Sequence, residues 1–80
     1  MITVEVRLYA TLRKYAPGLK IGEALRLSLE AGARLSDLLA HLGVPEEELK
    51  TAFVNNRRQE GDYLLQDGDR VALFPPVAGG

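Results

Sequence analysis

Apolar and polar residues alternate along residues 2–8 of the chain. Every second residue there is apolar, namely Ile2, Val4, Val6 and Leu8. Successive side chains of a strand point to opposite faces of its sheet, so this pattern predicts a strand with one buried face. The same alternation predicts a second strand over residues 25–30 and a last strand over residues 70–74. In the last strand, Val71 and Leu73 share one face and Phe74 lies on the other.

A helical period replaces the alternation in the middle of the chain. Apolar residues recur there at positions i, i+3, i+4 and i+7, namely Leu35, Leu38, Leu39 and Leu42. This spacing predicts one helix with a single apolar face. Ser36 and Asp37 suit the beginning of this helix, whereas His41 in the last turn and Gly43 just after it suit its end.

Turn signals separate the remaining segments. Pro17-Gly18 ends residues 10–15, which are expected to form a short helical turn. Asn55-Asn56 predicts a tight turn after a short strand over residues 51–55, because asparagine tolerates positive φ. The loop between the first two strands is too long for a two-residue hairpin turn, so a looser antiparallel return is expected.

The last third of the chain adds a further element. A short strand is expected within residues 59–65, around Tyr63 and Leu64, and Asp67-Gly68-Asp69 signals a turn before the last strand. The order is therefore strand, strand, helix, and then two or three more strands. It predicts an α+β domain in which a small sheet of four to five strands is covered on one face by one main helix.

Composition narrows the class of protein. The chain has 80 residues, 46% of them hydrophobic, which suffices for one small core. There is no cysteine, which excludes disulfides, thiolate metal sites and a cysteine nucleophile. The net charge of −1 offers no overall attraction to nucleic acid or anionic lipid. No apolar stretch approaches the roughly 20 residues that span a bilayer, so a cytoplasmic protein without nucleic-acid or membrane partners is expected.

The end of the sequence offers the clearest chemistry. It reads Phe74-Pro75-Pro76-Val77-Ala78-Gly79-Gly80. The prolines lack N–H groups and cannot continue a helix or a sheet, so a folded domain over residues 1–74 and an extended tail over residues 75–80 are expected. Glycine has no Cβ and can lie extended in a channel too narrow for other residues. The terminal carboxyl of Gly80 is then the only reactive group of the tail.

These residues resemble a known family, the ubiquitin-like sulfur-carrier proteins, and within it the small subunit of molybdopterin synthase. The most specific part of the resemblance is residues 67–80, Asp-Gly-Asp-Arg-Val-Ala-Leu-Phe-Pro-Pro-Val-Ala-Gly-Gly. Weaker matches are residues 8–13, Leu-Tyr-Ala-Thr-Leu-Arg, and residues 54–56, Val-Asn-Asn. The resemblance implies a β-grasp (ubiquitin-like) fold with a mixed sheet, in which the first and last strands pair in parallel.

The resemblance also implies a mechanism. An E1-like adenylating enzyme uses ATP to adenylate the carboxylate of Gly80, and a sulfur donor then converts it to a thiocarboxylate. In the molybdopterin branch the loaded tail enters the large synthase subunit and gives its sulfur to a pterin precursor. The chain itself is then a carrier and not an enzyme, with no bound cofactor. Gly79, Ala78, Val77, Pro76 and Pro75 would thread into the partner.

Three residues are candidates for partner contact. Phe74 shares the outer face of its strand with Ala72, which favours an exposed docking contact over a core position. Tyr9 falls on the outer face of the first strand by parity. Arg13 suits an ion pair with a partner, and a solvated arginine fits it equally well. Two features depart from the family pattern: Asn56, where glycine is frequent, and the charged outer residues Glu5 and Arg7 of the first strand, where apolar residues are frequent.

Several alternatives stay open. The same sulfur chemistry serves thiazole, thiolated tRNA or a sulfur-containing amino acid, and a Gly-Gly end also suits a ubiquitin-like protein modifier. A β-grasp binding module with an inert tail, using Arg7 and Arg57-Arg58, is the rival from a different class. An intrinsic enzyme is disfavoured, because no nucleophile–base pair or metal constellation is visible. His41 suits a surface position and Glu46-Glu47-Glu48 a solvated turn, so no metal site is expected.

Overall fold

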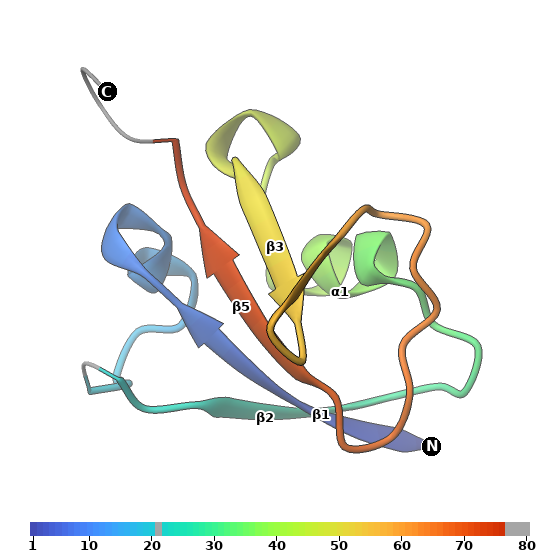
Figure 1. The fold of residues 1–80 in the computed structure, drawn as a ribbon. Coiled ribbons are helices and arrows are strands. Elements are labelled where there is room, and N and C mark those ends of the chain that lie inside the picture. Colours follow the sequence, from blue (N-terminus) through green and yellow to red (C-terminus); the bar gives the residue numbers. More distant parts are fainter. Residues whose placement is uncertain (21, 77–80) are drawn as a thin grey trace.

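The computed structural model describes residues 1–20 and 22–76, and within them five strands form one mixed sheet (Figure 1). The strands are β1 (Ile2–Leu8), β2 (Leu25–Leu29), β3 (Thr51–Val54), β4 (Arg57–Gln59) and β5 (Arg70–Phe74). One α-helix, α1 (Leu35–Leu42), and two 3₁₀ segments, η1 (Ala10–Tyr15) and η2 (Glu46–Glu48), complete the secondary structure. The predicted α+β class, with one main helix against a small sheet, is confirmed.

The two strands at the centre of the sheet come from opposite ends of the chain. The order of the five strands in the sheet is β2-β1-β5-β3-β4. Strand β1 pairs with β5 in parallel, with Val6 opposite Val71 and Leu8 opposite Leu73. Strand β2 adds to β1, and β3 to β5, both antiparallel. Because β1 and β5 run in the same direction, both end at the same edge of the sheet. The parallel pairing that the resemblance implied is therefore present.

Alternation along the central strands builds the core. The inward residues Val4, Val6, Val71 and Leu73 are at most 2% exposed. Leu35 and Leu38 of α1 and Leu12 of η1 complete the same buried cluster. Complete burial of such a side chain contributes about 1.5–3 kcal/mol, so α1 and η1 are held mainly by their leucines.

Short polar contacts set the two ends of α1. At its start, Oδ2 of Asp37 accepts a hydrogen bond from the backbone N–H of Arg34 at 2.8 Å. At its end, Gly43 adopts a left-handed φ of 79° and donates its N–H to the carbonyl of Ala40. Glycine adopts this conformation without a Cβ clash, which explains why the helix stops there.

The fourth strand differs from the one expected around Tyr63 and Leu64. That expectation was wrong, since Leu64 forms only an isolated bridge with Arg34, and the fourth strand is β4. The cause is the two-residue turn before it, where Asn55 and Asn56 have φ values of 53° and 69°. Two successive positive φ values are typical of a turn that reverses the chain at once. Strand β4 lies at the sheet edge, so its residues need no apolar alternation.

A buried carboxylate ties this turn to β5. Asp69 is 5% exposed, and its Oδ1 accepts a hydrogen bond from Nδ2 of Asn55 at 2.8 Å. Its Oδ2 accepts a second bond from the backbone N–H of Gln66, also at 2.8 Å. The Asn55 side chain in turn accepts the backbone N–H of Arg70 at 3.0 Å. These bonds fix the start of the central strand that leads to the C-terminal tail.

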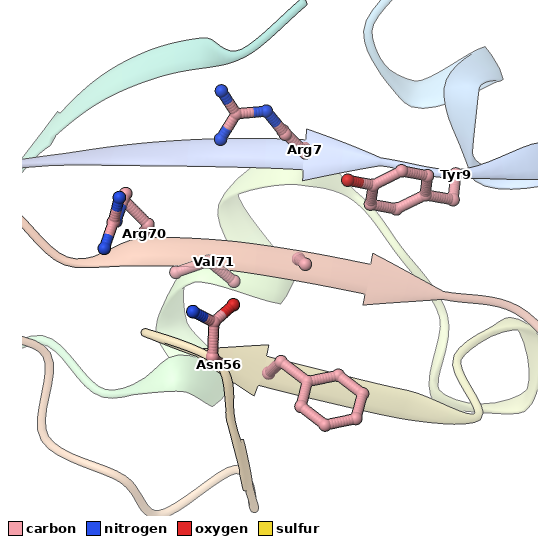
Figure 2. A pocket seen from close by; sticks show the side chains of 7 residues that line it. Arg7, Tyr9, Asn56, Arg70 and Val71 are labelled. Atoms are coloured by element: carbon pink, nitrogen blue, oxygen red, sulfur yellow. The ribbon is translucent and has the colours of Figure 1, made fainter. Parts of the chain in front are cut away.

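The face of the sheet opposite α1 is open and carries charged and aromatic residues. Figure 2 shows part of this outer face, with Arg7 on β1, Tyr9 just after β1, and Arg70 on β5. Arg26 of β2 pairs with Glu5 of β1 at 3.2 Å on the same face. This outer face lies away from the buried cluster that α1 covers, so it is available to a partner.

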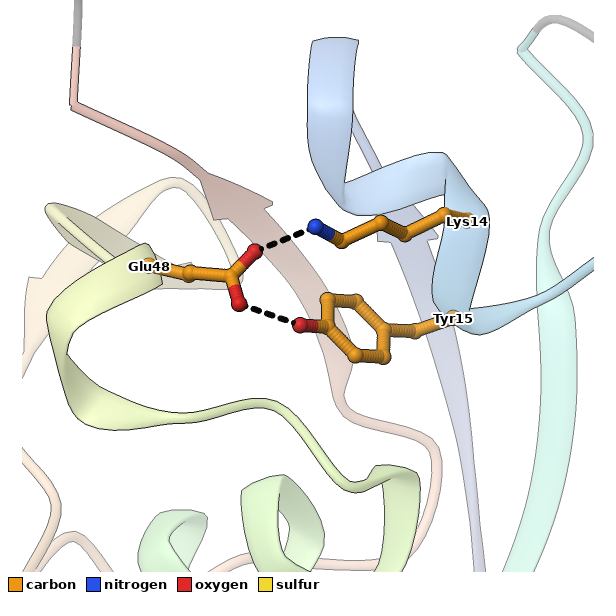
Figure 3. Close-up of polar contacts among 3 residues, drawn as sticks. All are labelled: Lys14, Tyr15 and Glu48. Carbon is orange, nitrogen blue, oxygen red and sulfur yellow. Dashed lines mark hydrogen bonds and ion pairs between the residues drawn. The ribbon is translucent and has the colours of Figure 1, made fainter.

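A polar clamp joins η1 to η2 near the end of β5 (Figure 3). Nζ of Lys14 lies 2.7 Å from Oε1 of Glu48, and the hydroxyl of Tyr15 donates a hydrogen bond to Oε2 at 2.6 Å. The bond to Lys14 lowers the pKa of the Glu48 carboxyl, and the bond to Glu48 raises the pKa values of Lys14 and Tyr15. The expectation of a merely solvated acidic turn was therefore wrong for Glu48, which is bonded to Lys14 and Tyr15. The sequence pattern did not reveal these contacts, because the two partners are 34 and 33 residues earlier in the chain.

Within residues 1–20 and 22–76, no helix has the length and apolar character needed to cross a membrane.

Replacing Asp69 with alanine is expected to destabilise the fold by about 2–3 kcal/mol, because two buried donors lose their acceptor. Urea unfolding measures this change. Asp67→Ala is the matched control: Asp67 accepts one bond from the backbone N–H of Thr3 but is exposed, so water replaces the bond and the cost is below about 1 kcal/mol. Equal losses for the two variants would contradict the role given to the buried carboxylate.

The clamp predicts a specific pH dependence of stability. A lowered pKa means that the contribution of Glu48 is present above its ordinary pKa of 4.5 and is lost as the pH falls through the lowered value. Glu48→Gln is therefore expected to lower Tm by about 1–3 °C at neutral pH and to match the wild type in strong acid. Glu47→Gln, an exposed neighbour, is the control for thermal unfolding across pH. A difference between Glu48→Gln and the wild type that persists in acid would refute the assignment.

Candidate functional site

The tail begins where β5 ends. Phe74 is the last residue of β5, and its carbonyl accepts the backbone N–H of Lys50 at 2.8 Å. Pro75 is half-buried, Pro76 is exposed, and neither belongs to a strand. Because proline has no N–H to donate, strand pairing stops there, as predicted. The remaining tail residues of the prediction, Val77, Ala78, Gly79 and Gly80, lie outside the described residues, so their threading and chemistry stay predictions.

An aromatic cluster surrounds the start of the tail. The rings of Tyr9 and Phe74 stack with centroids 4.6 Å apart and planes 3° apart. Phe53 meets Phe74 edge-on, with centroids 5.8 Å apart and planes at 90°. Each such pair contributes about 0.5–1.5 kcal/mol beyond the burial of its area. The cluster therefore holds the residue from which the tail departs.

The structure places the predicted partner contacts as follows. Phe74 lies on the outer face, as predicted, but it is half-buried because Tyr9 and Phe53 pack against its ring. Tyr9 is 37% exposed on the same face. Arg13 is exposed on η1 and makes no side-chain hydrogen bond or ion pair with the residues that the structure describes. Tyr9 and Phe74 thus come together, and Arg13 stays apart from them.

The backbone directly after Tyr9 turns sharply. Ala10 has a φ of 52°, a left-handed conformation that costs a residue with a Cβ roughly 1 kcal/mol. Two hydrogen bonds hold the turn: the N–H of Tyr9 reaches the carbonyl of Leu73 at 3.2 Å, and the N–H of Leu12 reaches the carbonyl of Tyr9 at 3.1 Å. The turn leaves the Tyr9 side chain on the outer face against Phe74.

A shallow hollow of about 140 Å³ lies beside the aromatic cluster on the outer face (Figure 2). The residues that line it are Arg7, Tyr9, Phe53, Asn56, Arg70, Val71 and Ala72. Its wall is therefore aromatic and aliphatic on one side and cationic on the other. Among the described residues no carboxylate lies within 4.0 Å of the guanidinium of Arg7 or Arg70.

Two parts of this site were missed in the sequence analysis. Phe53 belongs to the aromatic cluster, and alternation over residues 51–54 would have placed it outward, because Ala52 and Val54 face the core. The hollow needs Arg7 beside Ala72 and Ala72 beside Phe53, a register of three strands that no local pattern reveals.

The described residues contain no group of three or more His, Cys, Asp or Glu side chains able to hold a metal ion.

Comparison with known proteins gives the family. The model of the ThiS family matches residues 6–80, nearly the whole chain. No curated protein matches significantly. Among the solved structures that share the fold are proteins from Pyrococcus furiosus, Methanosarcina acetivorans and Helicobacter pylori.

The first is a putative molybdopterin converting factor, subunit 1, from Pyrococcus furiosus, with 28% identity and a TM-score of 0.77 over 96% of this chain and 100% of that one. The second is the small archaeal modifier protein 1 from Methanosarcina acetivorans, with 26% identity and a TM-score of 0.69 over 100% and 98%. The third, at 24% identity, is similar in fold: a complex of subunits 1 and 2 of molybdopterin-converting factor from Helicobacter pylori, with a TM-score of 0.63 over 99% and 100%.

The mixed five-stranded sheet with one main helix, the end of β5 at Phe74 and the family match agree with one another. The β-grasp fold expected from the sequence is confirmed by these structural likenesses. The chain belongs to the ThiS family of ubiquitin-like sulfur carriers.

Proposed function

We propose that this chain carries sulfur as a thiocarboxylate on Gly80 and donates it in molybdopterin synthesis. The observation that carries this proposal is the likeness to the putative molybdopterin converting factor subunit of Pyrococcus furiosus, at 28% identity over 96% of the chain. The family match also extends to Gly80 itself. The proposed partners are an E1-like adenylating enzyme, a sulfur donor and the large subunit of molybdopterin synthase, and the proposed location is the cytoplasm.

The chemistry follows from the carboxylate. A C-terminal carboxyl has an ordinary pKa of about 3.5, so it is ionised at neutral pH and is a poor electrophile. Its oxygen attacks the α-phosphorus of ATP and releases pyrophosphate, which makes an acyl adenylate. The donor supplies sulfur as hydrosulfide, which attacks the acyl carbon. The bond from this carbon to the phosphate-linked oxygen breaks, AMP leaves with the former carboxylate oxygen, and the S–H proton passes to water, which leaves the thiocarboxylate. The thiocarboxylate sulfur is a soft nucleophile and needs no base from this chain.

The described residues support a reaction in which this chain supplies the carboxylate and the partner proteins supply catalysis. The central strand β5 and the aromatic cluster hold the chain rigidly up to Phe74, and the prolines then end strand pairing. Tyr9, Phe53, Phe74 and the two arginines of the hollow include no nucleophile–base pair. ATP binding and catalysis are therefore assigned to the partners, and the chain contributes the tail and a surface that identifies it.

A second candidate function rests on a separate likeness. The small archaeal modifier protein 1 of Methanosarcina acetivorans is 26% identical over the full chain, which favours a protein modifier joined through Gly80 to lysines of targets. Both functions begin with adenylation of the same carboxylate and differ only in the nucleophile that follows. Hydrosulfide gives the thiocarboxylate of the carrier, and a lysine amine gives the isopeptide bond of the modifier; AMP leaves in both cases.

Deleting Gly80 is expected to abolish sulfur loading, because the carboxylate would end one residue short of the adenylation centre. The chain is incubated with ATP, the E1-like enzyme and a sulfur donor, and intact mass reports replacement of one oxygen by sulfur. Gly80→Ala keeps the carboxylate but adds a Cβ, so slower loading is expected if the channel is narrow. Full loading of the chain that lacks Gly80 would refute the proposal.

The pathway and the modifier function are separated by what the chain binds and where Gly80 goes. The wild-type chain is expected to retain the large subunit of molybdopterin synthase on a column, in preference to a thiazole synthase or a tRNA-thiolating enzyme. Preferential retention of either of those enzymes would redirect the proposal to that product. Digested cell extracts are expected to contain no lysines that carry the glycine tail, and their presence would establish the modifier function.

A further inference from the structure

The outer face of the sheet is cationic although the whole chain is not. The net charge of the chain is −1, yet Arg7 and Arg70 stand on this face without a carboxylate partner among the described residues. Two carboxylates lie near Arg70, and both are engaged elsewhere: Glu5, which is opposite Arg70 in the register, is held by Arg26 at 3.2 Å, and Asp67 accepts a hydrogen bond from the backbone N–H of Thr3 at 2.8 Å. Arg7 makes only a long hydrogen bond, 3.4 Å from its Nε to the carbonyl of Gly22. Two guanidinium groups are therefore left to bind an external anion.

The hollow between these arginines has the size of a side chain. Its volume is about 140 Å³, whereas pockets for small-molecule ligands measure roughly 300–1,000 Å³. Phe53 and Ala72 provide apolar surface beside the guanidinium groups. An aspartate or glutamate side chain matches this combination, because its methylene groups can pack on Phe53 and its carboxylate can accept paired hydrogen bonds from an arginine.

Single-stranded RNA fits the same face less well. Sequence-tolerant RNA binding needs exposed aromatic faces on which bases stack. Here Tyr9 and Phe74 stack on each other at 4.6 Å, and Phe53 meets Phe74 edge-on. The rings are engaged within the protein, so the unpartnered feature of this face is its charge.

The hollow is also linked to the tail. Tyr9 lines the hollow and stacks on Phe74, the last residue of β5 before the tail. Phe53 likewise lines the hollow and contacts Phe74. A protein that receives the tail beyond Phe74 must therefore cover or border the hollow.

We propose that the hollow receives an acidic side chain of the enzyme that adenylates Gly80, and that Arg7 and Arg70 thereby select this partner. This inference rests on the proposed function, because it takes adenylation as the step at which the partner binds. The arginines are recognition residues and touch none of the reacting atoms. They act on association of the two proteins and leave the chemical step unchanged.

Reversing both charges with Arg7→Glu and Arg70→Glu is expected to raise KM for the chain in ATP–pyrophosphate exchange by about tenfold or more, with kcat nearly unchanged. The wild-type KM rises with salt, because the pairs are partly screened, and the KM of the variant does not. The KM of the variant with both Arg7→Gln and Arg70→Gln is expected to lie between those of the wild type and the double reversal. Thermal unfolding of each variant checks that the fold is kept.

Arg57→Glu is the matched control. Arg57 is exposed on β4 and pairs with the inward residue Val54, so a single charge reversal there lies off the outer face and does not line the hollow. The variant of equal charge that it matches is Arg7→Glu alone, which is expected to raise KM where Arg57→Glu does not. A KM for the double reversal equal to that of this control overturns the inference. So does a self-association of the wild-type chain that the double reversal abolishes without a change in KM, since a second copy would then be the occupant.

The deletion of Gly80 separates the two levels of the proposal. If the deletion abolishes pyrophosphate exchange and the double reversal has no effect, the proposed function stands and the assignment of the hollow falls. If the wild-type chain supports no exchange with the adenylating enzyme, the proposed function itself falls. Restoration of a low KM by an Asp→Arg or Glu→Arg change on the enzyme, only with the doubly reversed chain, would establish the pairing directly.

Discussion

The parallel pairing of β1 with β5 is the constraint on which the rest of the structure depends. It brings the first and last strands together at the centre of the sheet, with Val6 opposite Val71. Parallel neighbours cannot be joined by a hairpin, so everything between them must form the crossover. That crossover contains α1, which covers the inner face. Both central strands end at one edge, and this is why Tyr9, after β1, meets Phe74 at the end of β5.

Polar contacts from the neighbouring loops hold both ends of β5. Before β5 begins, Asp69 binds Asn55 and the backbone of Gln66, which sets the start of the strand. At its other end, the clamp of Glu48 with Lys14 and Tyr15 joins the two 3₁₀ segments near Phe74 (Figure 3). A small domain has little apolar area to hold its ends, since only about 60% of its surface is buried. Directional hydrogen bonds take over that task at both ends of β5.

Most of the fold could be predicted from the sequence because its elements have clean periods. Alternation at residues 2–8 and 70–74 and the leucine spacing of α1 appear directly in the buried residues. The strand expected at Tyr63 and Leu64 failed because β4 is set by the turn at Asn55 and Asn56 and lies at an edge, where polar residues suffice. The parallel partner of β1 came only from the resemblance, since no local pattern encodes which strands become neighbours.

In the candidate site, too, the features that depend on one strand could be predicted from the sequence, and those that depend on several elements could not. Phe74 and Tyr9 could be assigned to the outer face by parity, because each depends on one strand alone. The hollow depends on the register of β1, β5 and β3 together, and the clamp on two loops that are far apart in sequence. In the function proposed above, the reactive group is on the tail, so binding specificity is assigned to the folded surface, which is built from cross-strand neighbours. The residues that distinguish one carrier from another are therefore the ones that sequence periodicity reveals least.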